Sequence, residues 1–201
     1  GTARFRSAIH NRFAKDIAPD GPEKIYLSRS ALGLGKGGML GEERLEELLQ
    51  AEGYEVFHPQ QHDLATQIAR YKAAKKVVAA DGSALHLYAM VGRPDQSVAM
   101  ILRRQSTSNN LLASNVTHFC GAEPKVISAL RTEWVRKNQK KSSRLSFGEL
   151  DHSVIGAALS AGGFISGDGQ WPVLTEEERA QVFADKGLNA SRDFMENPEF
   201  V

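Results

Sequence analysis

Cysteine is almost absent from this sequence, which has only Cys120 among its 201 residues. A single cysteine excludes an internal disulfide and leaves no set of thiolates for a metal site. The six histidines lack the combination of zinc-ligand spacing and supporting carboxylates that such a site requires. We therefore expect no metal site and no obligatory cofactor, and a reducing, cytoplasmic location.

Long hydrophobic runs are also missing. No apolar stretch approaches the roughly 18 residues that cross a bilayer, and no signal-peptide core follows the basic N-terminus. The charge is nearly balanced, with 25 basic and 24 acidic residues and a net charge of +1. The basic segment 136–146 has no interleaved aromatics. We expect no membrane span in this chain and no nucleic-acid partner.

An initiator methionine is absent too, because the sequence begins with Gly1. We expect a processed chain or a piece of a longer protein, whose N-terminal domain, or a second copy of the chain, could complete a site. The predicted organisation has three parts. They are a leading helix or linker (1–22), a Rossmann-like domain (23–165), and a C-terminal helix and tail (166–201).

Apolar segments alternate with amphipathic ones over residues 24–102. This order predicts an α/β fold, a Rossmann-like parallel sheet flanked by helices. The expected strands are 25–27, 54–57, 77–80 and 98–102, and the expected helices are 3–17, 42–50, 63–74 and the segment after Ser83.

The C-terminal half has a weaker pattern. We expect a weak helix at 109–119, a strand from Lys125 that continues toward Trp134, and an exposed loop or hairpin turn at 136–146. Helices are expected at 147–161 and 175–183, followed by a poorly packed tail.

A turn at Asp81-Gly82-Ser83 connects a buried-type strand to a helix. Free backbone N–H groups at such a turn bind anions, and the helix has no glutamate in its first turn. We expect Gly82 and Ser83 to hold a phosphate. The alternative is that Asp81 or Ser83 caps the helix and occupies those N–H groups.

Glycines also fill the loop Gly33 to Gly38, which contains Lys36. The spacing is not that of a phosphate-binding loop, and we interpret it as a mobile flap. Arg29 directly follows the first strand, where its guanidinium could grip a phosphate in bidentate fashion. In the functional reading, Arg29 and Lys36 flank a diphosphate.

Three further side chains are candidates for sugar contact or proton transfer. Asp81 lies in the turn, His86 lies one turn into the following helix, and Glu42 opens an earlier helix. A lone histidine on a helix is also a common structural residue. Cys120 has no identifiable base, so nucleophilic hydrolysis has no support.

Several short motifs together resemble glycosyltransferase family 61. The family has a strand ending in Ser-Arg, an Asn-Glu pair opening a helix, a Gly-aromatic turn, a Gln-containing helix, and an Ala-rich strand before a glycine-rich turn. The corresponding segments here are Ile25–Arg29, Gly41-Glu42, Gly53-Tyr54, Gln67, Ala73-Ala74 and Asp81–His86. Asp81 stands where the family often has histidine, and Gly41 where it has asparagine.

The resemblance implies one half of a GT-B architecture, the C-terminal domain that binds the donor. It implies inverting sugar transfer from a nucleotide sugar to a glycan acceptor, without an obligatory metal, in bacterial capsular or exopolysaccharide biosynthesis. The alternative function is a non-catalytic nucleotide- or partner-binding Rossmann-like module, and a purely structural domain is a third possibility.

Overall fold

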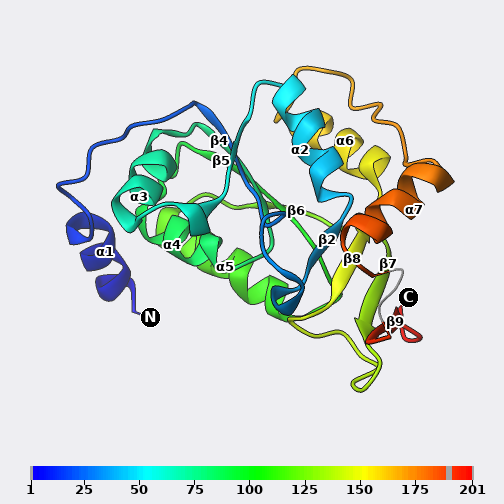
Figure 1. Cartoon of the computed structure of the whole chain (residues 1–201). Coiled ribbons are helices and arrows are strands. Elements are labelled where there is room, and N and C mark those ends of the chain that lie inside the picture. The colour runs from blue at the N-terminus through cyan, green and yellow to red at the C-terminus, as the bar shows by residue number, and fades with distance from the viewer. Residues whose placement is uncertain (1, 189–191, 201) are drawn as a thin grey trace.

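Five strands form an all-parallel sheet at the centre of the protein (Figure 1). The computed structural model describes residues 2–188 and 192–200. The sheet has the order β3-β1-β4-β5-β6. Its strands are β1 (Lys24–Leu27), β3 (Glu55–Phe57), β4 (Lys76–Ala80), β5 (Ser97–Ile101) and β6 (Lys125–Ile127). The predicted α/β, Rossmann-like class is confirmed.

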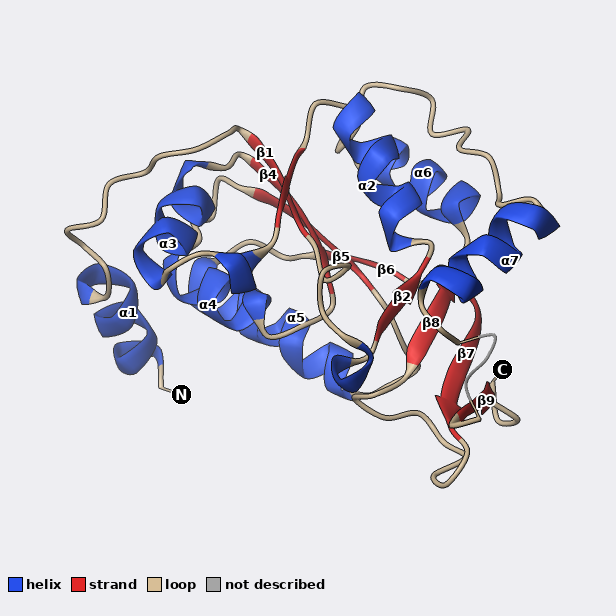
Figure 2. Ribbon diagram, in the orientation of Figure 1, coloured by secondary structure: helices blue, strands red, loops and turns tan. Residues whose placement is uncertain are grey.

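Helices cover both faces of this sheet (Figure 2). Alternate side chains point to opposite faces of a strand, so Leu27 packs with the first layer of helices and Tyr26 with the second. The first layer contains α3 (Leu64–Ala73), α4 (Ala84–Val91) and α5 (Ser108–Cys120), and the second contains α2 (Glu42–Ala51) and α6 (His152–Ala161). No helix in the described part of the chain is long and apolar enough to cross a membrane.

The strand order reverses between β1 and β4. The chain leaves β1 toward β3 on one side, then returns across β1 to form β4, β5 and β6 on the other. In an open α/β sheet, ligands bind outside the carboxyl ends of the strands at such a reversal. The fold therefore directs attention to the residues that follow β1 and β4.

A second sheet, which the sequence did not predict, lies beside the first. Its order is β2-β8-β7-β9, with β2 parallel to β8 and the other pairs antiparallel. The strands are β2 (Gly38–Leu40), β7 (Leu130–Arg136), β8 (Phe147–Leu150) and β9 (Phe194–Glu196). The helix α7 (Glu176–Asp185) contributes Phe183 to the apolar cluster beside this sheet.

This sheet corrects four predictions. The helix expected from residue 147 begins at His152, because Asp151 caps it, and 147–150 form β8 instead. The strand from Lys125 does not continue to residue 134, since β6 and β7 belong to different sheets. The tail is not loosely packed throughout, because Leu188 and Phe194 are buried. Gly1, residues 189–191 and Val201 of the predicted leading and C-terminal parts lie outside the described residues.

The fourth correction concerns the glycine flap. Leu34–Lys36 form a short 3-10 helix, η1, but Gly37 and Gly38 are buried and lead into β2. Gly37 has φ +64°, and a Cβ there would lie 2.7 Å from the carbonyl oxygen of Ser146. Only glycine fits this contact, so the loop is anchored at its C-terminal end.

The leading helix α1 (Ala3–Arg12) is shorter than the predicted 3–17 and has no buried residue. Phe5 is 53% exposed, whereas Phe13 and Ile17, beyond the helix end, pack against the first helical layer. A second 3-10 turn, η2 (Pro59–Gln61), follows β3.

Candidate functional site

Three polar segments meet where β1, β4 and β5 end. Leu27 lies opposite Ala79, and Ala80 lies opposite Ile101, so the residues after these strands emerge side by side. These residues are Ser28-Arg29, Asp81-Gly82-Ser83 and Arg103-Arg104. The sheet thus brings together residues that are about 75 positions apart in the sequence.

Arg29 lies directly over Gly82. A Cβ on Gly82 would be 2.8 Å from Arg29 Nη1 and 3.3 Å from its Cδ, so the missing side chain makes room for the arginine. Nη2 of Arg29 donates to the carbonyl oxygen of Lys36 at 3.1 Å. Among the described residues, buried Nε of Arg29 has no hydrogen-bond partner. The guanidinium is therefore held at the turn by one hydrogen bond and retains N–H groups that could donate to a ligand.

The amino end of α4 is free to bind an anion. Ser83 is its N-cap residue, but its side chain makes no capping bond. In the part of the chain that is described, no hydrogen bond uses the backbone N–H of Gly82, Ser83 or Ala84. Neither Asp81 nor Ser83 therefore caps α4 through its side chain, and the capping alternative is wrong. Free N–H groups at a helix start favour negative charge.

Asp81 pairs with Arg103. Nε of Arg103 lies 2.8 Å from Asp81 Oδ1, with both side chains almost fully buried. Burial raises the pKa of the Asp81 carboxyl, opposed by Arg103, Arg104 and Arg29. Burial lowers the pKa of Arg103 to about 10, opposed by Asp81, so Arg103 stays cationic at neutral pH. The other oxygen, Oδ2, is buried without a donor from any described residue.

The sequence prediction missed Arg103 and Arg104. Arg104 Nε is also buried and unpartnered within the described residues, and its charge acts on both Arg29 and Arg103. Their position in the sequence could have revealed them, since two consecutive arginines follow a buried strand. These three guanidinium groups outnumber the two buried carboxyl groups beside them, those of Asp81 and Glu42, and so leave positive charge to attract an anion.

Glu42 lies beneath this cluster. Its side chain is 0% exposed, and its Oε1 accepts from Arg29 N at 2.7 Å and from Tyr26 Oη at 3.0 Å. The Ser28 hydroxyl, 3.3 Å away, donates its one proton to Oε1 of Glu46 at 2.5 Å. Burial raises the pKa of Glu42 to about 7. The carboxylate contacts the Arg29 backbone from inside the protein.

Two hollows open on either side of Ser83. The β1 hollow, about 250 Å³, is lined by residues that include Ser28, Arg29, Leu32, Gln67, Ser83 and Leu87. The β5 hollow, about 220 Å³, is lined by residues that include Asp81, Ser83, His86, Arg103, Arg104 and Asn109. Exposed His86 belongs to the β5 hollow, whereas Glu42 lines neither. The side chain of Lys36 is exposed and also lines neither.

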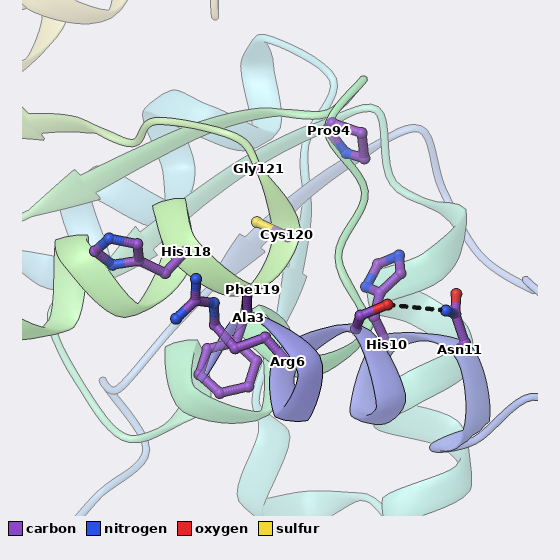
Figure 3. A pocket seen from close by; sticks show the side chains of 10 residues that line it. Ala3, Arg6, His10, Asn11, Pro94, His118, Phe119, Cys120 and Gly121 are labelled. Atoms are coloured by element: carbon purple, nitrogen blue, oxygen red, sulfur yellow. Dashed lines mark hydrogen bonds between the residues drawn. The ribbon is translucent and has the colours of Figure 1, made fainter. Parts of the chain in front are cut away.

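A larger hollow of about 390 Å³ lies between α1 and the end of α5 (Figure 3). It lies at the amino ends of the strands, opposite the candidate site, since Pro94 precedes β5 and Gly121 precedes β6. His10 and His118 extend over it, but no unpartnered buried polar atom belongs to a described residue that lines it. Size alone does not make it the site.

Metal ligands do not gather anywhere in the described residues, where no group of three His, Cys, Asp or Glu side chains could hold an ion. His58 and His62 are four residues apart, but η2 separates them and the His62 ring stacks on Phe57 at 4.5 Å. The chemistry at the strand ends is that of guanidinium groups, backbone amides and the carboxyl groups of Asp81 and Glu42.

Comparison with known proteins gives a family match over part of the chain. No curated protein matches the chain. The family described as Glycosyltransferase 61 matches residues 1–98, which run from α1 into β5. This range contains all seven site residues expected from the sequence, whereas Arg103 and Arg104 lie beyond it. Residues 1–98, just under half of the chain, are thus similar to glycosyltransferase family 61.

Proposed function

We propose that this protein binds the diphosphate of a nucleotide-sugar donor at the ends of β1, β4 and β5, and transfers the sugar to a glycan acceptor. The supporting observation is the meeting of three arginines with the free N–H groups of Gly82 and Ser83. The match of residues 1–98 to family 61 supports a sugar donor and an acceptor.

The donor would lie across both hollows. Arg29 and the N–H groups of Gly82 and Ser83 bind the diphosphate, with Lys36 reaching it from the loop. Arg104 faces the same anion from the β5 side. Arginine and oriented amides stabilise phosphate oxygens through charge-assisted hydrogen bonds.

Asp81 supplies the opposite chemistry. Its unpartnered Oδ2 needs a donor, because a buried acceptor without one costs free energy. A sugar hydroxyl provides that donor, whereas a bare phosphate does not. A ligand with both hydroxyl groups and an anion therefore suits this site, and a nucleotide sugar has both.

Transfer with inversion requires one proton acceptor and one stabilised leaving group. The acceptor hydroxyl gives its proton to the base while its oxygen bonds to the anomeric carbon. The bond from that carbon to the phosphate oxygen breaks, and the diphosphate leaves with the electron pair. His86 is the accessible candidate for the base. Asp81 is the second candidate, and Glu42 is the third and least accessible.

The finer parts of the proposal rest on the family resemblance. They are the donor-binding half of a GT-B enzyme, which a further domain or a second copy would complete, inversion without an obligatory metal ion, and a role in bacterial capsular or exopolysaccharide synthesis. A cytoplasmic location and the boundaries 1–22, 23–165 and 166–201 also stay predictions.

Titration calorimetry with uridine, guanosine and cytidine diphosphates tests the binding step. We expect one of them to bind, and Arg29→Ala to weaken its Kd at least about tenfold, as expected for losing a hydrogen bond to a charged group. Absence of binding by all three would refute the site.

A non-catalytic binding module is the competing function, and one observation favours it. Asp81 and Glu42 are both buried and hydrogen-bonded, which leaves exposed His86 as the accessible base. Release of nucleoside diphosphate from the nucleotide sugar separates the two functions. An enzyme loses this release in His86→Ala or Asp81→Asn, whereas a module binds the donor and releases nothing.

A further inference from the structure

A fully buried carboxylate needs an explanation, since burial of an ionised group costs several kcal/mol. Glu42 is such a group, and it lies where α2 passes under the end of β1. Its position at the first residue of α2 provides some compensation, because a helix start favours negative charge. An apolar side chain would fill the same space without the cost of desolvation.

The contacts of Glu42 are concentrated on the segment that carries Arg29. Oε1 accepts from the backbone N–H of Arg29 at 2.7 Å. A second donor, the Tyr26 hydroxyl, lies at 3.0 Å on the strand itself. One oxygen atom therefore fixes the backbone at the point where the Arg29 side chain begins.

The guanidinium end of Arg29 is fixed separately. The Lys36 carbonyl accepts from Nη2, and the absence of a side chain at Gly82 leaves room for Nη1. Arg29 is thus held at its backbone by Glu42 and at its tip by Lys36. A guanidinium fixed before the ligand arrives loses less conformational entropy on binding.

The second sheet determines where Glu42 lies. Gly41 turns the chain from β2 into α2 with φ +84°, and a Cβ there would be 2.8 Å from His152 Cε1. Nε2 of His152 donates to the Gly41 carbonyl at 2.8 Å. A connected series of contacts therefore runs from α6 through Gly41 and Glu42 to Arg29.

We propose that Glu42 is a positioning residue, which acts on the ligand only through Arg29 and makes no contact with substrate. This inference rests on the proposed diphosphate site. In this role Glu42 does not act as the catalytic base. It preorganises the guanidinium that binds the anion.

A double-mutant cycle tests the inference with uridine diphosphate, or whichever of the three diphosphates binds most tightly. We expect Glu42→Ala to weaken the Kd at least about tenfold, as Arg29→Ala does. In the Arg29→Ala background, adding Glu42→Ala should change the Kd less than threefold. Glu47→Ala is the control, because it changes an exposed glutamate of the same helix and should leave the Kd unchanged.

A measurement without ligand separates the inference from the proposed function. Above pH 7, where Glu42 is ionised, the Arg29 backbone amide proton should resonate downfield in the wild type and move upfield in Glu42→Ala, because its charge-assisted hydrogen bond is lost. Glu42→Gln keeps an acceptor oxygen, and it is the second variant to measure if the alanine variant does not fold. It should retain the diphosphate Kd within about threefold.

The outcomes are distinct. If the diphosphate binds and the two alanine effects add fully, Glu42 does not act through Arg29 and the inference is wrong, while the site remains. If no diphosphate binds, the proposed function is wrong, and the amide resonance still reports whether Glu42 holds Arg29. An Arg29 amide that does not move in Glu42→Ala overturns the positioning role by itself.

Discussion

Replacing Glu42 by glutamine should stabilise the protein at alkaline pH relative to the wild type. Burial raises the pKa of Glu42 from its ordinary 4.5 to about 7, with smaller contributions from Glu46 and Glu43. At about 1.4 kcal/mol per pH unit, this difference corresponds to roughly 3 kcal/mol.

The sign follows from proton binding. Between pH 4.5 and 7 the folded protein retains the Glu42 proton and the unfolded chain does not, so the free energy of unfolding falls as pH rises. The Glu42 contribution is fully present below pH 4.5 and is lost as pH rises through 7. Glutamine does not titrate, and Glu42→Gln escapes this loss.

Urea unfolding of both proteins at several pH values measures the effect. The free energy of unfolding of Glu42→Gln minus that of the wild type should rise by roughly 3 kcal/mol from pH 4.5 to 8. Subtraction removes the other titrating groups that the two proteins share. Glu47→Gln, an exposed control on the same helix, should show a small difference at every pH. A flat difference for Glu42→Gln would refute the reasoning, because Glu42 would then ionise as an exposed residue does.

Three other substitutions test single contacts. Gly82→Ala should leave the melting temperature nearly unchanged and weaken diphosphate binding about tenfold by calorimetry, because a Cβ displaces the guanidinium above it. Gly37→Ala should lower the free energy of unfolding by at least about 2 kcal/mol in urea, since its φ and its carbonyl neighbours admit only glycine; Gly33→Ala, with open space around it, should be nearly neutral. Arg103→Ala should cost about 3–5 kcal/mol in the same assay by leaving Asp81 buried and unpaired, and a loss below 1 kcal/mol would contradict the buried pair.

The sequence was sufficient to predict the first sheet, because its strands are short apolar runs between amphipathic helices. Val77–Ala80 lacks polar residues, as expected of a strand covered on both faces, and the turn at Gly82 follows directly. Position after a strand was also sufficient to select Arg29. The same rule applied one strand further would have selected Arg103 and Arg104.

The second sheet could not be read from the sequence, for physical reasons. β2 has three residues and β8 has four, too few to show a period. Phe147 to Leu150 precede a true helix and share its spacing of apolar residues, so local pattern could not separate them. Their conformation is set by pairing with β7 and β2, and such long-range contacts leave no local trace. The contacts behind the proposed positioning role of Glu42 could not be read from the sequence for the same reason, since its partners are 13 to 16 positions away.

The site does not end where the family match ends. Residues 1–98 supply Arg29, Glu42 and the Gly82 turn, but Arg103 pairs with Asp81 from beyond that range. Further along the chain, a Cβ on Gly148 of β8 would lie 2.4 Å from the Arg103 carbonyl oxygen, and Glu133 of β7 accepts from the N–H of Gln105 at 3.3 Å. The second sheet therefore supports the arginine segment after β5 as it supports Arg29 through α2. Because both sides of the cluster rest on it, residues 99–201 are structurally part of the proposed donor site.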